Sequence, residues 1–297
     1  MILTVTINPL LERRLFFKNV SLGKTQRAIK EIFYAGGKGI NVSRQLNYLG
    51  LQNQAFTFLG GNNGKILRHC LQKDKIDFTV ISTKSETRIA DLIIEEEKKR
   101  VTSFLGINPK ITNDEVNEFK TKLNKMIQNC SIVVFSGSSP CEETDDIFSY
   151  GINLANEHDK ISILDTYGNH LQKSLSAQPT VVHNNITELE NTLNIDLSTE
   201  ENKINYLLDL NKKGIKWIFL TDNEKPIYAS KSGFIYKVEF PQIDVYDSTG
   251  SGDAFTAGVA FSLENSFAEA TEYNKKIEMI SVFLIISVTS LFNVQAN

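Results

Sequence analysis

Short apolar runs alternate with longer amphipathic stretches along most of the chain. The clearest apolar runs are rich in β-branched and aromatic residues, which is typical of buried strands. They are 2–7, 54–60, 131–137, 160–166, 179–184 and 216–222. Because the intervening stretches have helical periodicity, the pattern predicts an α/β fold with a mostly parallel sheet and helices on both faces.

Each of these strands stops at small or polar residues. Ligands of open α/β sheets bind outside the carboxyl ends of the strands. The polar residues that this rule gathers at one edge are Asn8, Ser136, Asp165, Asn185 and Thr221. We therefore expect the functional site at that edge.

Three segments depart from the strand and helix alternation: residues 11–17, 27–34 and 87–104. The third contains two strand-like runs around the charged stretch "EEEKKR", which predicts an antiparallel hairpin with a solvated turn. All three segments lie within one expected domain that spans residues 1–297.

Composition narrows the function classes. A chain of 297 residues with 41% hydrophobic residues can bury one large core, and a net charge of −3 calls for neither nucleic acid nor a membrane surface. The three cysteines have no metal-binding spacing, and the absence of a signal peptide favours reduced thiols in the cytoplasm. The apolar segment Met279–Val294 is interrupted by polar residues and is shorter than the ~20 residues of a membrane span, so we expect a buried helix.

The stretch Asp247–Gly258, "DSTGSGDAFTAG", is a flexible loop that leads into an apolar helix. A helix N-terminus has free N–H groups, and neighbouring glycines let an anion approach them. A carboxylate at Asp253 suits a second task, which is to accept a proton from a hydroxyl during phosphoryl transfer. A turn followed by a capped helix is the structural alternative.

A second glycine cluster opens a helix in Tyr34–Gly50, "YAGGKGINVSRQLNYLG". Its glycines allow a ligand to lie against the backbone, and Lys38 adds a positive charge. The stretch is not a Walker A loop, because the ending Gly-Lys-Ser/Thr is absent.

Together the two stretches resemble both signatures of the ribokinase-like (PfkB) family of carbohydrate kinases. Further matching segments are "TVTINP", "QRA", "ETR", "SGSSP" and "NITELE", and these look most like the branch of 1-phosphofructokinase and tagatose-6-phosphate kinase. The resemblance implies a three-layer α/β/α fold with a small β-sheet lid over the sugar site. It also implies a homodimer that forms through this lid.

The resemblance implies transfer of the ATP γ-phosphate to a sugar hydroxyl. Asp253 is then the base, and the backbone N–H groups from Gly250 through Ser251 and Gly252 to Asp253 form the anion hole. The "NITE" segment matches the family's element that organises Mg²⁺, with Glu188 acting through water. The cofactor-binding residues implied are Asn185, Glu188, Thr221, Asn223 and Thr249. A helix cap at Asn185 with Glu188 in the first turn is the structural alternative.

For the substrate, the resemblance implies a sugar phosphate. Arg27, Lys38 and Arg88 match the basic residues that grip its phosphate, since an unphosphorylated sugar gives three converging cations no partner. The remaining substrate-binding residues implied are Glu12, Gly37, Asn41 and Ser136.

Several positions depart from the family pattern. Glu12 stands where the branch has Asp, His183 stands where it has Lys, and Asn223 and Pro226 replace glycines of the nucleotide loop. We read His183 as a structural histidine, and we expect the altered loop to bind ATP loosely. The expected activity is phosphorylation of a ketose phosphate, with fructose 1-phosphate favoured. Tagatose 6-phosphate, or a weakly active or inactive sugar-phosphate-binding protein, is the alternative.

Overall fold

The computed structural model describes residues 1–239 and 250–265. Its strands are β1 (Ile2–Thr6), β2 (Leu10–Phe17), β3 (Lys30–Gly36), β4 (Asn53–Gly60), β5 (Phe78–Thr83), β6 (Arg88–Glu95), β7 (Arg100–Leu105), β8 (Ile132–Ser136), β9 (Ile161–Asp165), β10 (Val181–Asn185), β11 (Trp217–Asp222), β12 (Lys225–Lys231) and β13 (Phe234–Val238). Its helices are α1 (Lys38–Tyr48), α2 (Gly61–Lys73), α3 (Asn113–Gln128), α4 (Ile147–Glu157), α5 (Leu171–Ser176), α6 (Ile186–Leu193), α7 (Glu200–Lys212) and α8 (Ser251–Glu264).

The large sheet has nine strands in the order β13-β12-β11-β10-β9-β8-β1-β4-β5. Neighbouring strands from β5 to β11 are parallel, and β12 and β13 are antiparallel at one edge. All the strands expected from the apolar runs are present. The predicted mostly parallel sheet is therefore confirmed.

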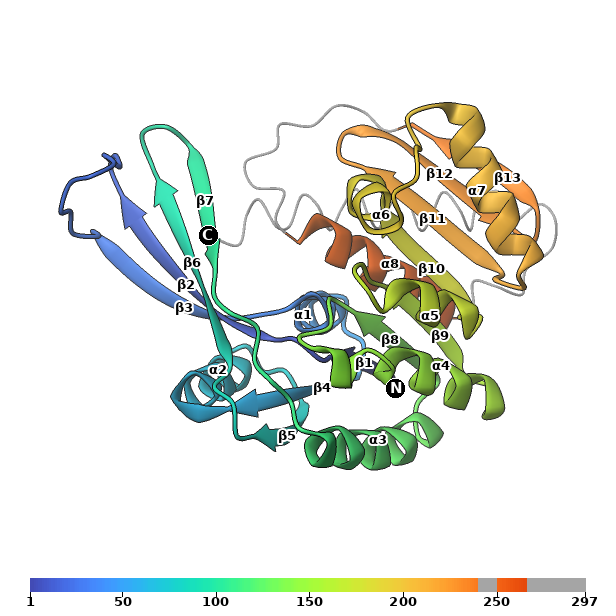
Figure 1. Cartoon of the computed structure of the whole chain (residues 1–297), viewed down its shortest axis with the longest axis horizontal. Helices are drawn as coiled ribbons and strands as arrows, with labels where there is room; N and C mark the ends of the chain where they lie inside the picture. The colour runs from blue at the N-terminus through green and yellow to red at the C-terminus, as the bar shows by residue number, and fades with distance from the viewer. Residues whose placement is uncertain (240–249, 266–297) are drawn as a thin grey trace.

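Helices cover both faces of this sheet, which gives the predicted three layers (Figure 1). One face packs on α3, α4, α5, α6 and α7, and the other packs on α1 and α8. Alternate residues of β1 point to opposite faces, so Leu3 joins the first core and Ile2 joins the second. Helix α2 packs separately against β4 and the small sheet.

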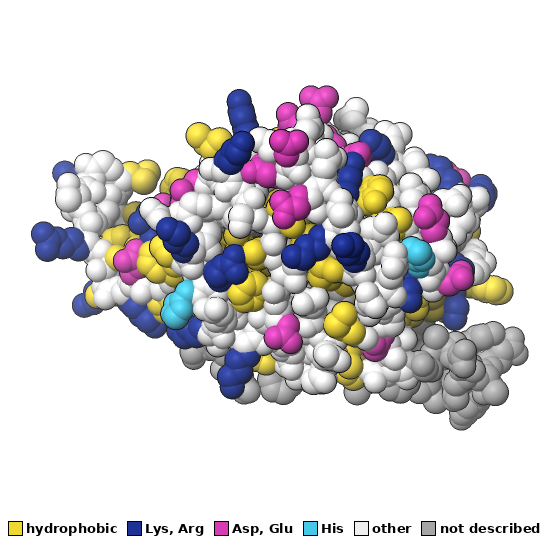
Figure 2. Space-filling view, turned by 90° about the horizontal axis from the view of Figure 1, so that it is seen from below, with side chains coloured by type: hydrophobic (Ala, Val, Ile, Leu, Met, Phe, Trp, Pro, Cys, Tyr) yellow, Lys and Arg dark blue, Asp and Glu magenta, His cyan; other side chains and the backbone are white. Residues whose placement is uncertain are grey.

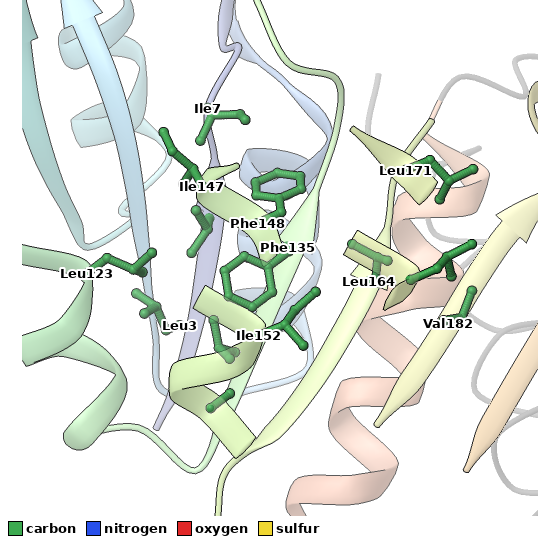
Figure 3. Packing of buried hydrophobic residues seen from close by; sticks show 14 of the residues in the cluster. Leu3, Ile7, Leu123, Phe135, Ile147, Phe148, Ile152, Leu164, Leu171 and Val182 are labelled. Atoms are coloured by element: carbon green, nitrogen blue, oxygen red, sulfur yellow. The ribbon is translucent and has the colours of Figure 1, made fainter. Parts of the chain in front are cut away.

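The larger core is built from aromatic and aliphatic side chains of β1, β8, β9 and the helices above them (Figure 3). Phe135 of β8 packs against Phe148 of α4, with ring centroids 5.4 Å apart. Helix α3 presents Val116, Phe119 and Leu123 to this core at helical spacing. Its start is fixed by a capping box between Thr112 and Glu115.

The second sheet has four strands in the order β3-β2-β6-β7 and projects from the side of the molecule (Figure 1). Strands β6 and β7 form the predicted antiparallel hairpin, and β2 and β6 pair in parallel. The first expected segment is β2, but only the end of the second, from Lys30, is strand. That the whole chain is one domain stays a prediction.

Surface and thiol chemistry agree with the composition. Cys70, Cys130 and Cys141 are free. In the part of the chain that the structure describes, no helix is long and apolar enough to cross a membrane. On the face shown in Figure 2, acidic and basic side chains are interspersed. The expected helix at Met279–Val294 lies outside the described residues.

Gly151 of α4 gives a test of this packing. Alanine is normally more favourable than glycine inside a helix by up to ~1 kcal/mol. Here a Cβ would lie 2.5 Å from two ring carbons of Phe135. Gly151→Ala should therefore lower the free energy of unfolding by about 1–3 kcal/mol in denaturant titrations. Asn153→Ala, at an exposed position of the same helix, should not lower it. Equal or greater stability of Gly151→Ala would contradict the packing.

Candidate active site

The predicted loop does end at a helix N-terminus. Gly250 is the N-cap of α8 and has φ of 83°, a left-handed conformation that favours glycine. None of the described side chains caps this helix, so the N–H groups of its first turn, from Ser251 to Asp253, remain available. Thr249 lies outside the described residues.

Asp253 lies in the first turn of α8 and is 5% exposed. The side-chain amide of Asn41 on α1 donates a hydrogen bond of 2.8 Å to its Oδ2. Arg44, one turn along α1, donates to the Oδ1 of Asn41 at 2.6 Å and binds Asp74. Arg44 thus fixes the orientation of the Asn41 amide, which in turn holds the carboxylate.

Burial is the main cause that raises the pKa of Asp253, to about 7, and the nearby charge of Asp165 adds to it. The hydrogen bond from Asn41 and the charge of Lys38 act in the opposite direction. A carboxylate with a pKa near neutrality is suited to accept a proton from a hydroxyl. The electrostatics at Asp253 are therefore compatible with a general base, and that role stays a prediction.

Lys38 is the first residue of α1, and its ammonium connects α1 with β9 and α6. Its Nζ lies 2.7 Å from Glu188 Oε2 on α6 and 3.4 Å from Asp165 Oδ1 at the end of β9. Burial alone would lower the pKa of Lys38, but the charges of Asp165, Glu188 and Asp253 outweigh it and raise the pKa. In this structure the ammonium of Lys38 is held by carboxylates, and its expected contact with the substrate phosphate stays a prediction.

The N-terminal end of α1 lies close to the end of β1. Gly37 is its N-cap with φ of 126°, and a Cβ there would lie 2.9 Å from Thr6 Cγ2. Only glycine fits this position without strain. This close approach places Lys38 and Asn41 at the carboxyl edge of the sheet.

Asp165 is almost completely buried and is the residue that the site assignment from sequence missed. Its Oδ2 accepts hydrogen bonds from Ser136 Oγ at 3.2 Å and Thr256 Oγ1 at 3.0 Å. Burial raises its pKa, but Lys38, His183 and Thr256 outweigh that effect and hold the pKa below its usual range. The sequence rule for strand ends had pointed to Asp165, but no motif gave it a role.

Ser136 is fully buried, and its hydroxyl donates to Asp165. The expected contact of Ser136 with a substrate stays a prediction. His183 is also buried, with its ring nitrogens 2.9 Å from Thr256 Oγ1 and 3.0 Å from Thr221 Oγ1. The interpretation of His183 as structural agrees with this geometry.

Asn185 caps α6, because its Oδ1 accepts from the backbone N–H groups of Thr187 and Glu188. Its side chain therefore has the structural role that sequence analysis had left open, and Glu188 extends from the first turn to Lys38. Among the described residues, no group of three His, Cys, Asp or Glu side chains could hold a metal ion. Asp165 and Glu188 share one cation, and a pair of carboxylates suits Mg²⁺ when phosphates and water complete its shell. The donor set fits a nucleotide-bound magnesium.

Arg88 is the first residue of β6 and belongs to a polar cluster at the base of the small sheet. Its guanidinium donates to the backbone oxygen of Asn8 at 3.1 Å and to Asn108 Oδ1 at 3.2 Å. The Asn8 amide nitrogen lies 3.1 Å from both Asn108 and Ser138. The strand-end rule had placed Asn8 at this edge of the sheet, but Asn108 and Ser138 were not predicted from sequence.

The three predicted phosphate-binding cations have different partners in the structure, and their convergence on one phosphate stays a prediction. Arg27 is exposed in the loop before β3, and no ion pair links it to another described residue. Glu12 on β2 binds Arg14, whose guanidinium lies 4.7 Å from the centre of the Tyr34 ring. In the described residues, only Arg88 remains without a carboxylate partner and half-buried at the site.

The altered nucleotide segment is a tight hairpin turn between β11 and β12, in which Asp222 pairs with Lys225. Asn223 has φ of 48°, a left-handed conformation that asparagine tolerates better than most residues. Asn223, which stands where the family pattern has glycine, therefore adopts the turn conformation without forcing the turn outward. Pro226 lies in β12.

Comparisons with known proteins give one family and several relatives. The family model for pfkB family carbohydrate kinases matches residues 14–278. A tagatose-6-phosphate kinase of Staphylococcus epidermidis is 32% identical over 266 residues, covering 89% of this chain and 85% of that one. The structure of a possible 1-phosphofructokinase from Thermotoga maritima has a TM-score of 0.84 at 26% identity, covering 96% of this chain and 92% of that one. The tetrameric inhibited form of phosphofructokinase-2 from Escherichia coli has a TM-score of 0.86 at 22% identity, covering 98% of this chain and 94% of that one, and shows the fold.

The base assignment predicts a pH dependence. Since Asp253 must be unprotonated to accept a proton, kcat/KM should rise with pH through about 7 and level off above it. Asp253→Asn should lower kcat by ~10²–10⁴ while circular dichroism shows an intact fold. Turnover near that of the wild type, or an unchanged profile with no rise near neutrality, would remove Asp253 from this role.

Proposed function

The chain belongs to the pfkB family of carbohydrate kinases, and on that premise we propose that it transfers the γ-phosphate of ATP to a hydroxyl of a ketose phosphate. Fructose 1-phosphate is the favoured acceptor and fructose 1,6-bisphosphate the product. The proposal is supported by similarity to a possible 1-phosphofructokinase and to a tagatose-6-phosphate kinase.

The proposal that the substrate carries a phosphate rests on Arg88, whose guanidinium is partly buried and incompletely hydrogen-bonded. Burial lowers the pKa of its guanidinium, and none of the described carboxylates compensates its charge. Its Nε is buried without a hydrogen-bond partner, and so is the neighbouring Asn8 Oδ1. A buried cation with a free donor requires an anion, and a free amide oxygen suits a hydroxyl. A sugar phosphate supplies both groups.

The reaction follows from the positions of Asp253 and the α8 N-terminus. The acceptor hydroxyl gives its proton to Asp253 while its oxygen forms a bond to the γ-phosphorus. The bond from that phosphorus to the β,γ-bridging oxygen breaks, and ADP leaves with the electron pair. The first-turn N–H groups of α8 stabilise the charge on the transferred group. Asp165 and Glu188 would hold magnesium, which neutralises phosphate charge when it is bound.

Tagatose 6-phosphate is the alternative acceptor, because it also carries a phosphate and a ketose ring. A weakly active sugar-phosphate-binding protein is the other alternative. The raised pKa of Asp253 and the intact hydrogen-bond path from Arg44 through Asn41 favour an active enzyme. Loose ATP binding and a cytoplasmic location stay predictions.

Arg88 gives the test of the substrate class. Arg88→Met should raise KM for the sugar phosphate by about tenfold or more, as expected for loss of a charge-assisted contact of ~1.5–3 kcal/mol, and should leave KM for ATP unchanged. Arg68→Met serves as the control, because Arg68 lies on α2 over the Phe78 ring and should not affect either constant. If KM for the sugar phosphate does not change in Arg88→Met, the phosphate binds elsewhere.

The small sheet gives the test of the proposed homodimer. Strand β7 is at an edge, and the segment from it to Ile107 exposes Val101, Phe104, Leu105 and Ile107. An apolar edge of this kind suits pairing with a second copy. Phe104→Asp should convert a dimer into a monomer in light scattering at micromolar concentration.

Phe234→Asp is the matched control for this experiment. Phe234 is 71% exposed, but it lies on β13 at an edge of the large sheet. The dimer should persist in this variant. A wild-type monomer, or dissociation by Phe234→Asp alone, would exclude pairing through the small sheet.

A further inference from the structure

Lys38 occupies an unusual place among the carboxylates of the site. Its ammonium lies between Asp165 and Glu188, the two residues whose oxygens suit a nucleotide-bound magnesium. We propose that Lys38 is a resident cation that holds these two carboxylates in the free protein and moves away when a divalent cation binds them. This inference rests on the proposed function, because that function is what assigns magnesium to the two carboxylates.

In the free protein the positive charge of Lys38 balances the negative charge of Asp165. Asp165 is 2% exposed, and a buried carboxylate without a compensating cation is strongly unfavourable. Lys38 supplies that compensation at 3.4 Å. The free protein therefore keeps Asp165 ionised without needing a metal ion.

Lys38 and a divalent cation compete for the same carboxylate oxygens. The ammonium is 2.7 Å from Glu188 Oε2, a distance at which it uses the same oxygen that a divalent cation would use. Two cations that close to one another repel strongly in a buried site. Lys38 and a divalent cation therefore cannot both hold this pair of carboxylates.

Lys38 also has room to move and alternative partners when it leaves the two carboxylates. Its side chain is 25% exposed, and the chain of a lysine has several rotatable bonds. The Tyr167 ring already lies 4.9 Å from its Nζ and offers a cation-π contact. Phosphates of a bound nucleotide would give the ammonium a better partner. Lys38 thus makes binding of the metal alone unfavourable and favours its entry together with the nucleotide.

The test is binding of Mn²⁺ to the full chain without nucleotide or sugar, measured by the EPR signal of free Mn²⁺. Wild-type protein should bind weakly. Lys38→Met removes the charge and keeps an unbranched side chain, so it should bind Mn²⁺ about tenfold more tightly or better. Lys38→Gln, which keeps a hydrogen-bond donor for Glu188, should show the same increase if Lys38→Met does not fold. Lys38→Arg, which keeps the charge, should bind as weakly as the wild type.

Two controls locate the ion. The gain should disappear in the double variant Lys38→Met/Glu188→Gln. Lys237→Met, which removes a lysine 3.1 Å from Glu200 on the surface, should show no gain. In thermal unfolding, Mn²⁺ should raise the Tm of Lys38→Met more than that of the wild type.

Equal Mn²⁺ affinity of the wild type and both neutral variants would overturn the inference. A gain that persists in the double variant would overturn it too, because the ion would then bind elsewhere. These outcomes are separate from the failure of the proposed function. A protein that phosphorylates no sugar phosphate but gains Mn²⁺ affinity on loss of Lys38 would refute the kinase and keep the resident cation.

Discussion

The ion pairs of Lys38 connect the parts of the molecule on which the site depends. Residues from α1, β9 and α6 meet at a single ammonium, and Asp253 of α8 lies within its electrostatic influence. The single charge of Lys38 does not balance the three acidic groups around it, so the pKa values of these acidic groups differ. The pKa of Asp165 falls and that of Asp253 rises to about 7, which separates a permanent anion from a proton acceptor.

The parallel sheet is what makes this meeting possible. Neighbouring parallel strands end at the same edge, so β8, β9 and β10 deliver polar residues to one place although long stretches of chain separate them. The helices then add their N-terminal turns at the same edge. The loop and helix residues of two glycine clusters, far apart in sequence, are joined by the hydrogen bond from Asn41 to Asp253.

Sequence patterns predicted what depends on local periodicity and on short motifs. The apolar runs located the strands, and the cap at Asn185 and the start of α8 followed from residue types at fixed spacing. Side-chain partners were harder, because they depend on three-dimensional contacts. Ser136 and Lys38 both lie at the expected edge of the sheet. Their common partner is Asp165, which accepts a hydrogen bond from the Ser136 hydroxyl and another from the Lys38 ammonium. Arg44 carried no signal beyond its place one turn after Asn41.

Glu12 shows how a departure from the family pattern can be absorbed in the small sheet. Its longer carboxylate does not stay free, because Arg14 on the same face of β2 binds it and stacks over Tyr34 of β3. The extra methylene is thus taken up by an ion pair within the sheet. The base, the α8 N-terminus and the carboxylate pair are built from other elements and do not depend on this arrangement. A change at Glu12 should therefore disturb the small sheet while leaving Asp253, the α8 N-terminus and the pair of carboxylates in place.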